Sequence, residues 1–257
     1  MESDRHRGDN LQDQLFVKVF TAARVTIDPS WCSRDVCSGY WRLYRNGRDG
    51  ASVLWQGGEY RLTPRALHVI PAWVRFSCLC RKPVDHFYVH FELIGLTAVT
   101  VRRLFQKPMS LPDQSLPDPT NVFRVKAWVY EAMAELFATV PSQRWTELHA
   151  AQTRIAPALR YIEDHLGESL TNAYLATLCH CSEDHFIRLF RRTLGQPPAQ
   201  YILERRIAAA TQRLAFGDES IEQIAETLGF ANRYHFTRMF TRRMGVGPAT
   251  YRQQARV

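Results

Sequence analysis

The 257-residue sequence has no run of ~18 apolar residues, the length that a membrane-spanning helix needs. Its N-terminal stretch "MESDRHRGDNLQDQ" is polar and lacks the apolar segment of a secretory signal peptide. We therefore expect a soluble protein that resides in the cytoplasm and has no membrane partner.

The six cysteines lack the CxxC spacing of structural zinc sites and redox motifs. They fall instead into loose pairs, which are Cys32 and Cys37, Cys78 and Cys80, and Cys179 and Cys181. We expect reduced thiols, as in most cytosolic proteins.

Acidic residues are scarce in two stretches of a chain that is basic overall, with 33 Lys and Arg against 25 Asp and Glu and a net charge of +8. Residues 231–257 contain six arginines and no acid, and residues 185–213 contain six arginines and only Glu204. The acids between these stretches are Asp218, Glu219, Glu222 and Glu226. Positive charge clustered in this way indicates an anionic partner, most simply nucleic acid.

The chain is long enough for two modest domains, and the pattern of apolar and polar residues changes along its length. From about Phe16 to Leu104, short apolar or alternating runs such as "GYWRLY" and "DHFYVHFEL" are separated by turn signals such as "RNGRDG". This pattern predicts short strands in an antiparallel sandwich or barrel. The proline-rich segment 106–121 predicts an irregular connection.

Segment 122–140 has apolar residues at steps of three and four, which predicts an amphipathic helix. These residues are Val122, Val125, Val129, Met133, Leu136 and Val140. Such a stripe either docks on its own domain or binds a second copy of the chain in a homodimer, and the sequence leaves both alternatives open.

From about Ile155 the pattern is helical, and the phrase "HFIRLFRRTLGQPPAQY" at 185–201 returns nearly unchanged as "HFTRMFTRRMGVGPATY" at 235–251. In the first copy Ser182 can cap a helix that Gly195 ends in a left-handed conformation. The apolar face, which must be buried, consists of Phe186, Leu189 and Phe190. The opposite face is free to meet a partner and carries Asp184, Ile187, Arg188 and Arg191.

The second copy has the same organisation, with Asn232 as the cap. Its inward residues are Phe236, Met239 and Phe240, and its outward residues are Tyr234, Thr237, Arg238 and Thr241. A short capped helix and a tight turn precede each copy, opening at Thr171 and at Ser220, where Gln223 completes a capping box. A helix, a short turn and a second helix with an exposed basic face make a helix-turn-helix unit, and the sequence predicts two. The alternative is a duplicated helical pair that binds nothing.

Residues from about 155 to 254 resemble the DNA-binding domain of the AraC/XylS family of bacterial transcription regulators. The matching text includes "SLTNAYLA", "SEDHFIRLF", "GQPPAQYI" and "SIEQIAETLGFANRYHFTRMFTRRMGVGPATYR". The resemblance implies seven helices, with a central helix over about 198–215 that joins the two units. His180 stands in the first turn, where some members have glycine. We expect the turn to persist because histidine tolerates positive φ.

Carried over position by position, the resemblance implies two sets of DNA contacts. The candidates for base contacts are Asp184, Ile187, Arg188, Arg233, Tyr234, Thr237 and Arg238. The candidates for phosphate contacts are Arg191, Arg192, Arg242 and Arg243. Arginine can donate two hydrogen bonds to guanine, so Arg188 and Arg238 are the strongest candidates for sequence discrimination.

The strand-rich zone ahead of such a domain is similar to the cupin-like, jelly-roll effector domains of the same family. Alternation along "DHFYVHFEL" and "GYWRLY" collects polar and aromatic side chains on one face of each run. The candidate effector-binding residues are Tyr40, Arg42, Tyr44, His86, Tyr88, His90 and Glu92. If these faces line the barrel they suit a small polyol, and if they face solvent they are ordinary surface strands.

The histidines of this region do not have the spacing of a metal site. At about 3.3 Å per residue along a strand, His86 and His90 would lie about 13 Å apart, too far to bind one ion. The HxH pattern with a nearby Glu that metal cupins carry is also absent. We therefore expect no enzyme activity, no catalytic residues, no metal and no cofactor. A metal-cupin enzyme with an accessory helical domain and a DNA-repair methyltransferase adaptor stay as alternative classes.

The predicted fold class is α+β, in three regions. These are a cupin-like antiparallel β-barrel over 1–120, a helical dimerisation or linker region over 121–150, and an all-α AraC-type domain with two helix-turn-helix units over 151–257. The predicted function is a ligand-responsive transcription regulator, most simply an activator of carbohydrate-use genes. A repressor, or a sensor of a non-sugar small molecule, is the alternative. The implied partners are double-stranded promoter DNA, a small-molecule effector, RNA polymerase and a second copy of the chain.

Overall fold

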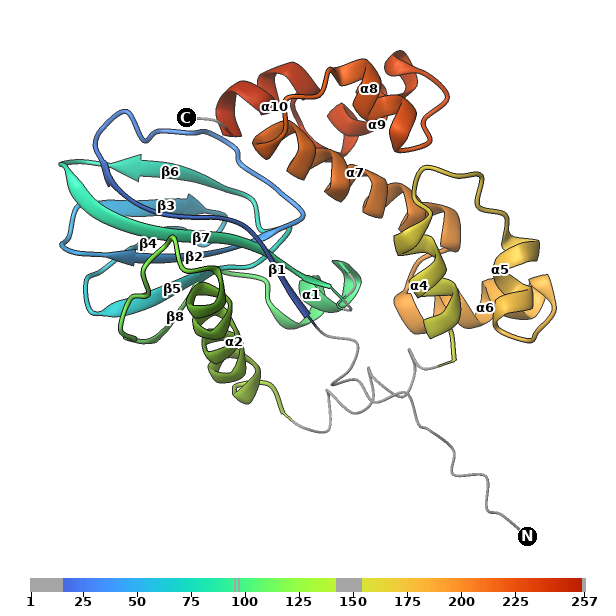
Figure 1. Ribbon diagram of the computed structural model, residues 1–257, viewed down its shortest axis with the longest axis horizontal. Coiled ribbons are helices and arrows are strands. Elements are labelled where there is room, and N and C mark those ends of the chain that lie inside the picture. The colour runs from blue at the N-terminus through green and yellow to red at the C-terminus, as the bar shows by residue number, and fades with distance from the viewer. Residues whose placement is uncertain (1–15, 95, 97, 142–153, 256–257) are drawn as a thin grey trace, which may run out of the picture.

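The computed structural model describes residues 16–94, 96, 98–141 and 154–255, which form two domains lying side by side (Figure 1). A β domain (residues 16–141) of antiparallel sheets precedes a helical domain (residues 154–255). This arrangement confirms the predicted α+β fold class.

The described part of the β domain contains two antiparallel sheets. One has the strand order β1-β7-β2-β5-β8 and the other the order β4-β3-β6. The strands are β1 (Phe16–Ile27), β2 (Trp41–Asn46), β3 (Ala51–Trp55), β4 (Gly58–Arg61), β5 (Ala66–Ile70), β6 (Phe76–Cys80), β7 (Val84–Ile94) and β8 (Met109–Pro112). The run "GYWRLY" overlaps β2 and "DHFYVHFEL" lies within β7, as predicted.

Helix α2 (Val122–Ala138) packs on the face of the five-stranded sheet that points away from the smaller sheet (Figure 1). Asn121 begins this helix, because its side chain accepts a hydrogen bond from the N–H of Arg124 at 3.1 Å. Most of the predicted apolar stripe is buried in the core of the β domain, namely Val125, Val129, Met133 and Leu136. The stripe therefore docks on its own domain and is not available to a second copy.

The two faces of β7 have different surroundings. Phe87, Val89 and Phe91 belong to the core under α2. The alternate residues point the other way, toward the smaller sheet, and β2 pairs with β7 so that Tyr44 lies opposite Tyr88 and Arg42 opposite His90. The polar and aromatic faces of both strands therefore line the interior of the β domain.

Two elements differ from the sequence-based expectation. Ala98–Leu104, inside the zone predicted as strands, is helix α1. Its valines and threonine favour a strand. Ala98, Val101 and Phe105 lie on one helical face and are buried, so packing against the β domain outweighs this propensity. Strand β8 lies inside the segment predicted to be irregular. It is an edge strand, a position in a sheet where proline is tolerated.

The helical domain has seven helices between residues 154 and 255, the number that the family resemblance implies. They are α4 (Ala156–Asp164), α5 (Asn172–Leu178), α6 (Glu183–Leu194), α7 (Pro198–Phe216), α8 (Ile221–Thr227), α9 (Arg233–Met244) and α10 (Pro248–Ala255). Helix α7 corresponds to the central helix expected over 198–215.

Helix α7 runs along the boundary between the two domains (Figure 1). A Cβ atom on Gly39 of the β domain would lie only 2.6 Å from Cβ of Ala208, so this close approach requires glycine. At the end of α7, the ring of Phe216 stacks on Phe20 with 5.5 Å between centroids. The helix that joins the two helix-turn-helix units is therefore also the helix that packs on the β domain.

Candidate nucleic-acid interface

The first helix-turn-helix unit, α5 and α6, has the predicted caps. The hydroxyls of Thr171 and Ser182 each accept a hydrogen bond from the backbone N–H three residues on, at 3.3 and 3.4 Å. Gly195 ends α6 in the left-handed region at φ 71°. His180 occupies the turn at φ 51°, which confirms that histidine supports the conformation for which some family members use glycine.

The second unit, α8 and α9, repeats this construction. Ser220 and Gln223 form the predicted capping box, with bonds of 2.8 and 3.1 Å. The side chain of Asn232 caps α9 by accepting a bond of 2.8 Å, and Gly245 ends the helix at φ 84°. Gly229 occupies the turn at φ 69°, the same left-handed conformation as in the first unit.

Each unit holds its second helix on a small aromatic core. Phe186 and Phe190 of α6 are fully buried, as are Phe236 and Phe240 of α9. The two rings meet edge to face in both units, with centroids 5.4 Å apart in α6 and 5.5 Å apart in α9. The repeated phrase therefore specifies the same packing twice, as the sequence predicts.

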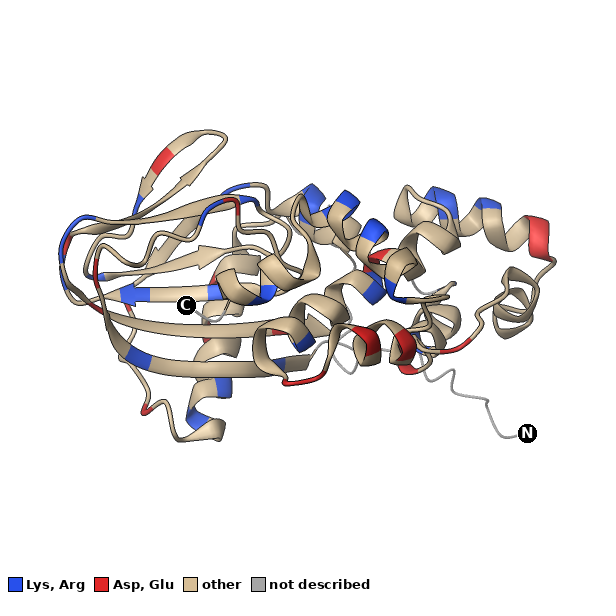
Figure 2. Ribbon diagram, turned by 90° about the horizontal axis from the view of Figure 1, so that it is seen from above, with Lys and Arg blue, Asp and Glu red and all other residues tan. Residues whose placement is uncertain are grey.

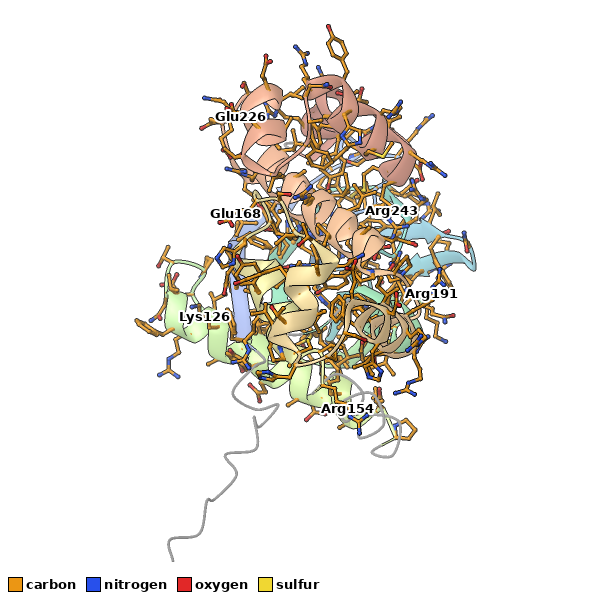
Figure 3. All side chains as sticks on the ribbon, turned by 90° about the vertical axis from the view of Figure 1, so that its right-hand side faces the viewer. Lys126, Arg154, Glu168, Arg191, Glu226 and Arg243 are labelled. Carbon is orange, nitrogen blue, oxygen red and sulfur yellow. The ribbon has the colours of Figure 1, made fainter. Side chains whose placement is uncertain are left out.

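The residues predicted to contact bases lie on the solvent side of α6 and α9. Tyr234 is 86% exposed. Asp184, Arg188, Arg233 and Arg238 are also exposed, while Ile187 and Thr237 are half-buried. In Figure 2, ribbon segments that mark Lys and Arg follow the upper edge of the helical domain. In Figure 3, Arg191 of α6 and Arg243 of α9 lie on one side of the molecule.

Among the residues predicted to contact phosphate, Arg191, Arg192 and Arg242 are exposed, whereas Arg243 is half-buried. The guanidinium of Arg243 donates a hydrogen bond to the carboxylate of Glu204 and lies 5.5 Å from the ring centroid of Trp73. Burial lowers the pKa of Arg243 below its ordinary value. Arg243 thus connects α9 to α7 and to the β domain.

Sequence analysis missed the central position of Glu204, whose side chain is only 4% exposed. Its carboxylate also accepts hydrogen bonds from Nη2 of Arg102 at 2.7 Å and from Nε2 of Gln196 at 3.1 Å. Together with Arg243, these donors come from α1, from the turn after α6 and from α9. The available signal was that Glu204 is the only acid in the basic stretch 185–213.

Arg205, the next residue of α7, forms a second link between the domains. Its Nη2 lies 2.7 Å from Oε1 of Glu92 on β7, and its Nε lies 2.6 Å from Oε1 of Glu163 on α4. The amide of Gln212 donates to the other oxygen of Glu92 at 3.0 Å. Glu92, a candidate effector residue, therefore bonds α7 at the domain boundary.

Four of the other candidate effector residues line a cavity of about 520 Å³ at the junction of the two domains. They are Tyr44, His86, Tyr88 and His90. The β domain adds Asp28, Ser30 and Trp31 to the walls, and the helical domain adds Ala215, Phe216 and Ala255. Tyr40 and Arg42 line a smaller cavity of about 70 Å³, which shares Tyr44 and His90 with the larger one.

The two histidines of the larger cavity are neutral near pH 7. Burial lowers the pKa of His86 to about 3, and its Nδ1 atom lies 2.7 Å from Oδ1 of Asn46. Burial, together with the charge of Arg42, holds the pKa of His90 well below its ordinary value. Nδ1 of His90 is buried and bonds no other described residue. A hydroxyl group of a ligand would satisfy this atom.

A helix-turn-helix domain family matches residues 175–254. The probable transcriptional regulator LumQ of Photobacterium leiognathi is 32% identical over 73 residues, which are 28% of this chain and 29% of LumQ. A Chromobacterium violaceum transcriptional regulator with an AraC-type DNA-binding domain is 29% identical, covering 42% of this chain and 96% of its own, with a TM-score of 0.40. Residues 175–254 therefore match a helix-turn-helix domain family, and the helical domain is similar to an AraC-type DNA-binding domain.

The chain spans less than a third of the length of LumQ. ToxT of Vibrio cholerae, solved with a bound unsaturated fatty acid, has the same fold over 99% of this chain and 98% of its own. Its TM-score is 0.53 and its sequence identity 14%. A β domain followed by a helical domain therefore occurs in a solved fold.

No helix in the described ranges is long and apolar enough to cross a membrane. Among the same residues, no three His, Cys, Asp or Glu side chains are placed to hold a metal ion. All six cysteines are free thiols.

Proposed function

We propose that this protein is a DNA-binding transcription regulator controlled by a small-molecule effector. The supporting observation is the pair of capped helix-turn-helix units whose recognition helices, α6 and α9, expose most of their candidate base-contacting residues to solvent. Two such helices joined by α7 suit successive major grooves, about 10–10.5 bp apart. Arg188 and Arg238 discriminate guanine, and the exposed arginines near the helix ends bind phosphates.

The effector in this proposal binds the 520 Å³ cavity. Rings of Trp31, Tyr44 and Tyr88 can stack on the C–H faces of a ligand, and the neutral imidazoles can exchange hydrogen bonds with hydroxyl groups. Asp28 is the one charged side chain among the described lining residues, and its carboxylate disfavours an anion. These properties suit a neutral polyhydroxy compound such as a sugar, and with it a role in carbohydrate use.

At a promoter the protein would contact RNA polymerase and activate transcription, with repression as the alternative. A homodimer would use the outward side of α2, because the inward stripe is buried. Phe123 on that side is 86% exposed and Tyr130 is 44% exposed.

Selection of random duplexes by the full-length protein tests the DNA-binding part. We expect an asymmetric consensus with two elements about one helical turn apart, because one chain carries two recognition helices. Failure to enrich any sequence would contradict this part of the proposal.

The same DNA-binding assay with added sugars, together with thermal unfolding, tests the effector. A ligand shifts an equilibrium only through its different affinities for two states, so Tyr88→Ala should lower sugar affinity and leave sugar-free DNA binding intact. Leu54→Ala, at an exposed site of β3 outside the cavity, is the control. If no sugar changes either signal, or if Tyr88→Ala responds like the wild type, the cavity is not the effector site.

A further inference from the structure

Arginines of the β domain lie at the C-terminal ends of both recognition helices. Nη1 of Arg75, just before β6, donates to the carbonyl oxygen of Met244, the last residue of α9, at 3.1 Å. A Cβ atom on Gly195, the cap of α6, would lie 2.9 Å from Nη2 of Arg103 on α1. Cations near helix C-termini stabilise the helix dipole, so the β domain contacts the helical domain where positive charge is favourable.

The two helix ends converge on Glu204. Gln196 lies one residue beyond the cap of α6, and Arg243 is the next-to-last residue of α9, yet both bond the same carboxylate. Arg102 of α1 bonds it as well. Helix α1 is therefore next to both recognition helices at the point between them.

The contacts leave an excess of positive charge in this region. Arg102 and Arg243 share one oxygen of Glu204, and both guanidinium groups lie over Trp73, 5.6 and 5.5 Å from its ring centroid. Arg103 is exposed and has no carboxylate partner within the part of the chain that the structure describes. Like charges held close together repel each other, and a bound polyanion relieves this repulsion.

Charge is also distributed unevenly over the whole molecule. In Figure 3, Arg191 and Arg243 lie on one side, whereas Glu168, Glu226 and Lys126 lie on the other. A cleft of about 340 Å³ continues the arginine-bearing surface from Arg102 to Trp55 and Gln56 at the end of β3. The surface that suits DNA therefore extends from the helical domain onto the β domain.

We propose that helix α1 of the β domain is part of the DNA interface, and that Arg103 binds a backbone phosphate between the two major-groove sites. This inference rests on the proposed DNA-binding function. A phosphate contact carries no sequence information, but it positions the protein on the duplex. The contact includes the β domain in the complex with DNA, so the domain that holds the effector cavity also touches the operator.

The test uses the full-length protein and a duplex that it selects, titrated at several salt concentrations. Arg103→Gln should weaken binding to all sequences alike and make the slope of log K against log salt shallower by about 0.9, the effect of one phosphate contact. Arg103→Lys keeps the charge and should restore the slope. Lys126→Ala removes a positive charge on the opposite side and should leave the slope unchanged.

Duplexes with one neutral methylphosphonate at each central position then locate the contact. At one methylphosphonate position, the wild type should bind more weakly than it binds the unmodified duplex. Arg103→Gln should bind that modified duplex and the unmodified one equally, because it lacks the contact to that phosphate. The α1 contact is overturned if Arg103→Gln has the salt slope of the wild type. It is also overturned if this variant has the unfolding temperature of the wild type and binds the duplex more tightly. Either result leaves the regulator proposal in place. A wild-type protein that selects no duplex would overturn both.

Discussion

Equivalent positions of the repeated phrase explain why Arg243 differs from the other arginines of the recognition helices. Arg188 matches Arg238 and Arg192 matches Arg242, and these four arginines are exposed. Arg243 matches Thr193 instead, which is buried. The inward position is where the structure places Arg243 against Glu204. Aligning the two copies does not by itself separate Arg243 from the other phosphate candidates, because Arg191 also matches a threonine, the exposed Thr241. The burial of Thr193 in the structure identifies the inward position.

The matched pairs, Arg188 with Arg238 and Arg192 with Arg242, allow a direct test of which arginines contact bases and which contact phosphates. Arg188→Ala or Arg238→Ala should cost about 1–3 kcal/mol on the preferred site and relax the preference at one base pair, because a bidentate contact to guanine is lost. Arg192→Ala and Arg242→Ala should weaken all sequences equally. Competition titrations with specific and non-specific duplexes measure both effects. Equal loss of specific and non-specific binding in all four variants would contradict the assignment.

At the scale of elements, the turn of each helix-turn-helix unit requires a residue in the left-handed conformation. This residue is His180 in the first unit and Gly229 in the second. A Cβ atom on Gly229 would lie 2.7 Å from both the carbonyl oxygen of Gly167 and Nη2 of Arg206. His180 adopts the same conformation with a side chain that is exposed. The second turn is therefore constrained by its neighbours as well as by its backbone.

Gly229→Ala should lower the free energy of unfolding by about 1–2 kcal/mol from the left-handed conformation alone, and by more because of the close backbone oxygen. His180→Ala, the matched control, should change it by less than ~0.5 kcal/mol because the position is exposed and already bears a Cβ. Urea unfolding followed by circular dichroism measures both. Similar losses in the two variants would show that contacts around Gly229 do not constrain the turn.

At the scale of the whole molecule, each helix-turn-helix unit has its own aromatic core, and α7 joins them within the helical domain. A fragment from residue 150 onward should therefore bind the selected duplex by itself. It should bind more weakly than the full chain, with a shallower salt dependence, because it lacks Arg103 of α1. It should also show no response to an effector, because most walls of the cavity belong to the β domain.

Salt titrations of the fragment and the full chain on one duplex test this division of roles. A folded fragment that binds no duplex would mean that the β domain is required to hold the two recognition helices in place.

The sequence by itself determined the local features of this protein. Capping residues, left-handed turn positions and the apolar steps of α2, α6 and α9 act over a few residues, so their pattern specifies each helix and turn wherever it packs. Alternation likewise specified the two faces of β7. The tertiary structure alone decided which faces meet. It made α1 a helix, turned Arg243 and Arg102 toward Glu204, and joined Arg205 to Glu92. These side-chain contacts connect residues 39 to 113 positions apart and depend on how α7 docks.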